Sequence, residues 1–238
     1  MPVDGQTIEG TLVTPEKLVP GILFVHGWGG SQDQDLARAR KIARFGCLCF
    51  TFDLRGHGAT EAQRESVTRE DNLNDLLAAY DFLAGQPAVD ASAIAVVGSS
   101  YGGYLAAILT SLRAVSWLGL RVPALYRDED WHTPKAALDR DDLNLYRQTW
   151  LSYKDNRALR ACAEFEGDAL IVESECDEIV PHPAIGGYTA AFRRARSLTY
   201  RMIKGADHAL TNKKARATYN KLLNRWVTTM VLGGRTGD

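Results

Sequence analysis

The feature that most constrains the fold of this 238-residue chain is the alternation of short apolar runs with longer amphipathic stretches. Most of the runs are apolar at nearly every position, which is typical of strands buried on both faces of a parallel sheet. Strands are expected at residues 22–25, 47–52, 93–97, 115–120, 169–172 and 198–203, with an earlier one at 6–13. Helices are expected at residues 32–45, 71–83, 101–112, 183–195 and 210–232. The pattern predicts a doubly wound α/β fold whose mostly parallel sheet carries helices on both faces.

A more polar segment, residues 122–165, interrupts this alternation between two of the expected strands. The chain shows no internal repeat and no low-complexity linker, so a single domain over residues 1–238 is the simplest organisation. The polar segment is then a small cap inserted over the carboxyl edge of the sheet. That edge is where open α/β sheets place their binding sites.

Bulk properties exclude several function classes. The net charge of −1 gives no electrostatic footprint for nucleic acid. No apolar run approaches the about 20 residues of a membrane span, and the N-terminus lacks the features of a signal peptide. The four cysteines form no zinc-like pattern and are expected to be reduced thiols in a cytoplasmic protein, a monomer or homodimer without metal or cofactor. Nucleic-acid and membrane partners are not expected.

The stretch GSSYG at residues 98–102 follows an apolar strand and precedes an apolar helix. It matches the G-x-S-x-G pattern in one register, which places Ser100 at the centre. In a nucleophile elbow the serine occupies a strained strand-to-helix turn, and its neighbours must be small because strand and helix approach closely. A structural Gly/Ser turn is the alternative, but the strand and the helix around the motif favour a catalytic serine.

A serine hydroxyl needs a base, and the base needs an orienting acid. His208 follows the last predicted strand and is the preferred base, because His132 lies in the polar segment and His182 starts a helix between two prolines. The acid is sought in the loop after the preceding strand. Its candidates are Glu173, Glu175, Asp177 and Glu178; Asp177 is preferred because it stands in the turn itself, with Glu175 in reserve.

Five stretches together resemble the α/β-hydrolase superfamily, in its order and over nearly the whole chain. They are HGWGG (26–30), DLRGHG (53–58), GSSYGG (98–103), DEIVP (177–181) and ADH (206–208). The resemblance implies that Ser100 is the nucleophile, Asp177 the acid and His208 the base. The chain is similar to small acyl esterases and to the catalytic domain of the prolyl-oligopeptidase branch. Peptidases of that branch usually carry an N-terminal propeller, for which this chain has no room.

The same resemblance implies an oxyanion hole made by two backbone N–H groups, those of Trp28 and Tyr101. His26 is expected to shape the loop of Trp28, and the residues at 53–58 are expected to lock it. The side chains of Trp28, Tyr126 and Trp131 are the expected lining of the substrate pocket, with scaffold packing as the alternative for each.

The resulting expectation is a cofactor-independent serine hydrolase of the carboxylesterase type, EC 3.1.1, acting on small or medium ester substrates through an acyl-enzyme. A peptidase or amidase and a thioesterase use the same triad and remain alternatives. A catalytically silent hydrolase fold that only binds its ligand is the alternative from another class.

Overall fold

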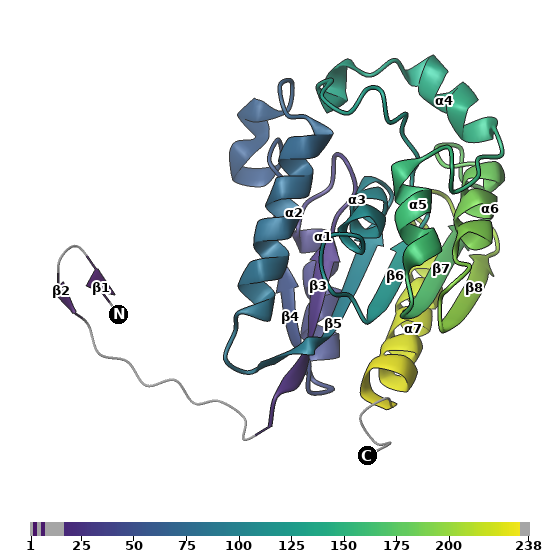
Figure 1. The fold of residues 1–238 in the computed structure, drawn as a ribbon. Helices are drawn as coiled ribbons and strands as arrows, with labels where there is room; N and C mark the ends of the chain where they lie inside the picture. Colours follow the sequence, from purple (N-terminus) through teal and green to yellow (C-terminus); the bar gives the residue numbers. More distant parts are fainter. Residues whose placement is uncertain (1, 4–5, 8–16, 234–238) are drawn as a thin grey trace.

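A six-stranded sheet forms the centre of the computed structural model, which describes residues 2–3, 6–7 and 17–233. Its order is β4-β3-β5-β6-β7-β8, and every neighbouring pair is parallel (Figure 1). The strands are β3 (Val19–Val25), β4 (Leu48–Thr51), β5 (Val89–Ser99), β6 (Trp117–Arg121), β7 (Asp168–Ser174) and β8 (Ser197–Ile203). Before them, β1 (Pro2–Val3) pairs with β2 (Gln6–Thr7), and the rest of the strand predicted at 6–13 lies outside the described residues. The predicted parallel sheet is confirmed.

Helices cover both faces of this sheet (Figure 1). Helices α2 (Arg69–Ala84), α3 (Tyr101–Leu109), α5 (Arg157–Glu164) and α6 (His182–Ala191) share one apolar core with one face, and α1 (Asp33–Ala43) and α7 (Lys213–Trp226) share a second core with the other. The two cores follow from strand periodicity, since successive side chains point to opposite faces. In β5, Ile94 and Val96 enter the first core while Ala95 and Val97 enter the second.

Helices α2, α5 and α7 begin at side chains that accept hydrogen bonds from their free N–H groups. Thr68 and Asp71 form a capping box at the start of α2. Asn156 and Asn212 accept N–H bonds at the starts of α5 and α7. Two short elements adjoin these strands and helices: the 3₁₀-helix η1 (Gly58–Gln63) after β4, and the π-helical turn η3 (Val227–Leu232) that continues α7.

The polar segment predicted as a cap joins β6 to β7 and contains η2 (Lys135–Ala137) and α4 (Arg140–Gln148). Its last helix, α5, packs against α3 and α6 and so belongs to the helix layer. The part that rises above the carboxyl edge of the sheet therefore ends near Asn156, with α4 at its outer limit (Figure 1).

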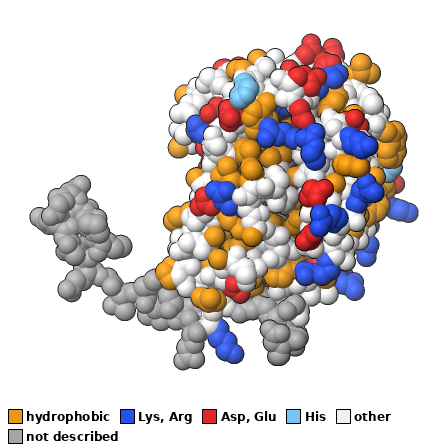
Figure 2. Space-filling model, in the orientation of Figure 1, with side chains coloured by type: hydrophobic (Ala, Val, Ile, Leu, Met, Phe, Trp, Pro, Cys, Tyr) orange, Lys and Arg blue, Asp and Glu red, His pale blue; other side chains and the backbone are white. Residues whose placement is uncertain are grey.

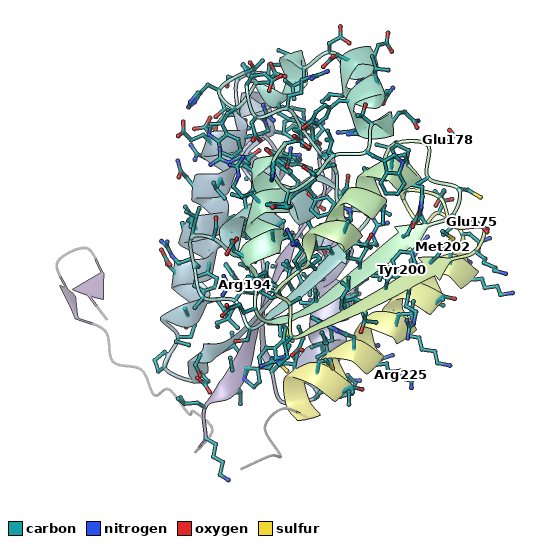
Figure 3. All side chains as sticks on the ribbon, turned by 45° about the vertical axis from the view of Figure 1, so that its right-hand side comes forward. Glu175, Glu178, Arg194, Tyr200, Met202 and Arg225 are labelled. Carbon is teal, nitrogen blue, oxygen red and sulfur yellow. The ribbon has the colours of Figure 1, made fainter. Side chains whose placement is uncertain are left out.

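The two edges of the sheet are more open than the sequence predicts. All four residues of β4 are half-buried, because this strand has a neighbour on one side only. At the other edge, Leu198 and Met202 of β8 are exposed, and Figure 3 shows Met202 and Tyr200 on this strand. Acidic and basic side chains are interspersed over the face drawn in Figure 2. Of the helices that the structure describes, none has both the length and the apolar character needed to cross a membrane.

Candidate active site

Ser100 occupies the turn between β5 and α3 with φ 52° and ψ −115°, a backbone conformation that residues other than glycine rarely adopt. The glycines of the motif are required by packing. A Cβ on Gly98 would lie 2.5 Å from the carbonyl oxygen of Gly102, and one on Gly102 would lie 2.3 Å from the carbonyl oxygen of Val25. The turn is therefore pressed against both its own helix and the end of the neighbouring strand β3, as a nucleophile elbow requires.

His208 lies in the loop between β8 and α7 and reaches both remaining members of the predicted triad. Its Nε2 is 2.9 Å from the Oγ of Ser100. Its Nδ1 is 2.7 and 2.9 Å from the two carboxylate oxygens of Asp177. With the Nδ1 proton donated to Asp177, Nε2 is the nitrogen that accepts the serine hydroxyl proton. The structure thus brings Ser100, His208 and Asp177 together in the predicted order.

Asp177 is held by its own loop, which follows β7. Its Oδ1 accepts the N–H groups of Ile179 at 2.9 Å and Val180 at 2.8 Å. Its side chain is only 2% exposed, against 18% for His208. The carboxylate can therefore orient the imidazole without competition from solvent.

The backbone of the His208 loop is fixed from the neighbouring strands. Arg121, the last residue of β6, donates from Nη1 to the carbonyl oxygen of His208 at 2.7 Å and from Nε to the Oγ of Ser99 at 3.3 Å. Asp207 accepts the N–H of Thr211 at 2.9 Å and so braces the same loop. The role of Arg121 could not be predicted from the sequence, because an arginine at a strand end carries no motif.

The loop between β3 and α1, which carries Trp28, is locked by two histidines. The Nε2 of His26 accepts the N–H of Leu54 at 3.1 Å, and the Nε2 of His57 accepts the N–H of Gly29 at 3.0 Å. Burial and then the nearby His26 lower the pKa of His57, which keeps its imidazole neutral and able to accept this bond. Both histidines shape the loop, as predicted.

The two predicted oxyanion donors flank Ser100. Tyr101 is the first residue of α3, and Gly27 in the loop of Trp28 approaches Ser100 so closely that its Cβ would lie 3.3 Å from that of the serine. Within residues 17–233, the backbone N–H groups of Trp28 and Tyr101 show no acceptor. Both are therefore available to an oxygen bound beside Ser100.

Ser100 and His208 open into a cavity of about 480 Å³ on the α1 and α7 side of the sheet. Its walls are mainly polar and come from the loop of Trp28, helix α1 and the loop that leads into α7. The charged side chains in its lining are Asp35, Arg38, Arg121 and Arg216. Asp35 pairs with Arg38 at 2.6 Å, so the remaining charge of the lining is positive.

Of the three side chains predicted to line the substrate pocket, Trp28 alone borders this cavity. Tyr126 and Trp131 are buried in the core under the cap, 3% and 8% exposed. Tyr126 packs edge-on against Tyr101 and Tyr104. The prediction for Tyr126 and Trp131 is corrected accordingly: the cap folds both rings inward, away from the cavity.

The other histidines and acids of the sequence have separate places. His132 pairs with Glu70 on the surface. His182 pairs with Glu173, which also accepts the hydroxyl of Tyr200. Asp53 accepts two bonds from Gln32 at the end of β4. No group of three or more potential metal ligands occurs in the described part of the chain.

Comparison with known proteins gives one family match and many fold matches. The sequence profile of the alpha/beta hydrolase family matches residues 22–220. The thiohydrolase aneE of Aspergillus aculeatus is 30% identical over 103 residues, which cover 42% of this chain and 32% of that protein. This chain spans about a third of the length of the curated relatives it matches.

Two solved structures illustrate the fold match. Est1E of Butyrivibrio proteoclasticus, solved with ferulic acid bound, superposes with a TM-score of 0.69 at 17% identity, covering 92% of this chain and 91% of that one. The acylaminoacyl peptidase of Pyrococcus horikoshii superposes with a TM-score of 0.68 at 18% identity, covering 92% of this chain but 38% of that one. At these identities the two matches establish a shared fold.

Proposed function

This chain belongs to the alpha/beta hydrolase family, and from that premise we propose that it is a serine hydrolase that cleaves carboxylic esters, with chemistry of the EC 3.1.1 type. The observation that carries the proposal is the continuous chain of contacts from Ser100 through His208 to Asp177. A hydroxyl, an imidazole and a buried carboxylate in this order form an activated nucleophile.

In the proposed mechanism, His208 takes the hydroxyl proton through Nε2 while Ser100 attacks the ester carbonyl. Asp177 stabilises the imidazolium that forms and does not itself take the proton. The backbone N–H groups of Trp28 and Tyr101 hold the oxyanion, each worth about 3 kcal/mol of transition-state stabilisation. His208 then protonates the departing alcohol, and a water molecule that it deprotonates releases the acid from Ser100.

A thioester is the second candidate substrate, and the identity with a thiohydrolase is the observation that favours it. An acyl-enzyme forms equally from an ester or a thioester, so the triad does not choose between them. The likeness to a peptidase supports an amide substrate less, because at 18% identity it establishes a shared fold alone.

The test is to measure initial rates on p-nitrophenyl esters of increasing acyl length, for the wild type and for Ser100→Ala. The wild type should hydrolyse at least one of these esters, and the kcat of the variant should be lower by at least about 10⁴-fold. A fluorophosphonate probe should label the wild type at Ser100. Full activity in Ser100→Ala, or an unlabelled wild type that turns over no ester, would contradict the proposal and favour a silent fold.

A further inference from the structure

Three cationic side chains from separate elements meet under the cap around one tyrosine ring. Lys135 comes from η2, Arg69 from α2 and Arg147 from α4. The Nζ of Lys135 and the guanidinium carbons of Arg69 and Arg147 lie 5.1, 5.5 and 4.9 Å from the ring centre of Tyr126. Cation–π contact with this ring stabilises each charge in part.

No carboxylate among residues 17–233 forms an ion pair with any of these three cations, which we call the cap cluster. Arg69 is fully buried; its Nη1 donates to the carbonyl oxygen of Arg127, while its Nε and Nη2 find no partner among the described residues. Arg147 donates to two carbonyl oxygens, those of Leu125 and Ile179. Buried donors left unpaired are costly and rare, so they indicate a missing acceptor.

Several arginines elsewhere on the molecule pair with carboxylates. Arg127 binds Asp142 in the same cap, and Arg113 binds Asp81. Charges of both signs also lie close together over the surface drawn in Figure 2. The cap cluster therefore gathers three basic side chains that have no carboxylate partner among the described residues, although the net charge of the chain is −1.

Lys135 connects the cap cluster to the candidate active site. Its Nζ lies 4.8 Å from the ring centre of Trp28, which borders the cavity of Ser100, and 5.7 Å from that of Tyr101. The side chain is only half-buried, and its ammonium has no hydrogen-bond partner in the described part of the chain. Burial, and then the charges of Arg147, Arg69 and Arg140, lower the pKa of Lys135 to about 7. An anion arriving from the cavity would relieve both the desolvation and the repulsion.

The position of the cap cluster relative to His208 indicates which half of an ester substrate, acyl or alcohol, would contact the cluster. His208 stands in the loop leading to α7, on one side of the sheet, and it must face the leaving alcohol that it protonates. Lys135 bonds through its backbone N–H to Val67, just before α2, and contacts rings in the core of α2 and α3 on the other side. A group bound by Lys135 therefore belongs to the acyl half.

We propose that the preferred substrate is an ester whose acyl half carries a second, ionised carboxylate, and that Lys135 binds this carboxylate in the field of Arg69 and Arg147. This inference rests on the proposed esterase function and names its substrate class. A site built with donors for a charged group rejects the analogue that lacks the group, because the donors are then left unpaired.

The experiment compares monomethyl esters of succinic, glutaric, adipic and suberic acids with methyl esters of the monocarboxylic acids of the same length, by released methanol. For at least one length the wild type should prefer the anionic ester by about 10-fold or more in kcat/KM. Lys135→Met should reduce this preference to about 2-fold or less, and Lys135→Arg, which keeps the charge, should retain most of it.

Lys154→Met is the matched control. Lys154 is also a cap lysine whose Nζ lies over a tyrosine ring, at 6.0 Å from that of Tyr153, but it is exposed and away from Trp28. This variant should keep the wild-type preference. A neutral p-nitrophenyl ester, run in parallel, reports the triad by itself. If that ester is cleaved while the wild type shows no preference for anionic esters, or if Lys135→Met slows both ester series equally, the inference is overturned and the proposed function stands.

Discussion

The Asp177–His208 pair and the Glu173–His182 pair are built from the same two groups, and a hydroxyl stands next to each. In the first, the imidazole is in the middle, with Asp177 on Nδ1 and Ser100 on Nε2. In the second, the carboxylate is in the middle, since Glu173 accepts from both His182 and the hydroxyl of Tyr200.

The two pairs also differ in exposure. Both carboxylates are nearly buried, but the side chain of His182 is 59% exposed and that of His208 only 18%. In the second pair the hydroxyl of Tyr200 bonds to the carboxylate and not to the imidazole, so His182 is not placed to take its proton directly. The order of the partners around the imidazole, rather than the presence of the three groups, therefore decides which pair can activate a nucleophile.

The largest difference between the two pairs is expected when each imidazole is removed in turn. His208→Ala should lower kcat on a p-nitrophenyl ester by about 10⁵-fold or more, because Ser100 loses its base. His182→Ala should leave kcat within about 2-fold of the wild type, because surface changes rarely alter chemistry elsewhere. Steady-state rates of ester hydrolysis measure both effects. Comparable losses of kcat in the two variants would show that both pairs contribute to catalysis.

The next change keeps the shape of each carboxylate and removes its charge. Asp177→Asn should lower kcat by about 10⁴-fold, because the amide cannot hold the tautomer in which Nε2 accepts a proton. Glu173→Gln should change kcat by less than about 2-fold. The same ester assay measures both variants, and circular dichroism establishes that they are folded. If Asp177→Asn remains active, Asp177 is not the orienting acid, and Glu175 is the next candidate to test.

A smaller effect is expected from the side chain that fixes the backbone of His208. Arg121→Met should lower kcat by about 10-fold with little change in KM, because the loop loses the bond to its carbonyl oxygen and the imidazole is less well positioned. Arg38→Met is the control, since Arg38 borders the same cavity without touching His208. Equal losses in the two variants would assign the effect to the charge of the cavity instead.

The smallest effect concerns stability and is confined to the second pair. Glu173→Gln should lower the free energy of unfolding by about 1–2 kcal/mol, because a buried charged acceptor with two donors is replaced by an amide. Urea unfolding at neutral pH measures it. Glu178→Gln, at the exposed loop position labelled in Figure 3, should leave the midpoint unchanged. A stable Glu173→Gln variant would mean that the second pair contributes nothing to the fold.

The sequence was sufficient to predict the sheet and the three side chains that meet at Ser100, because both depend on local order along the chain. Apolar runs mark the buried strands, and the turn around Ser100 needs glycines at fixed spacing. His182 was correctly placed at the start of a helix, which separated the second pair from the first.

The cap cluster could not be predicted in this way. Arg69, Lys135 and Arg147 stand in three separate elements, and each by itself resembles an ordinary surface cation. What distinguishes them is that they converge on one tyrosine ring without a carboxylate partner among the described residues, and that becomes visible when the cap is folded over α2. For the same reason Tyr126 and Trp131 were placed at the pocket wall, although the cap turns them into the core.

The contact of Gly102 with the end of β3 has a consequence for how such a protein can diverge. A methyl group at this position would clash with the carbonyl oxygens of both Val25 and His26. The close packing of the Ser100 turn against the start of the Trp28 loop therefore requires glycine at position 102. The segment over residues 122–156 is tied to the turn near its start, where the N–H of Ala124 donates to the carbonyl oxygen of Ser100 at 3.1 Å and Tyr126 packs against Tyr101. Farther along, Lys135 reaches the rings of Trp28 and Tyr101. Descendants of this chain would therefore change their substrate range through substitutions in the outer part of the cap, around α4, and would keep the residues around Ser100.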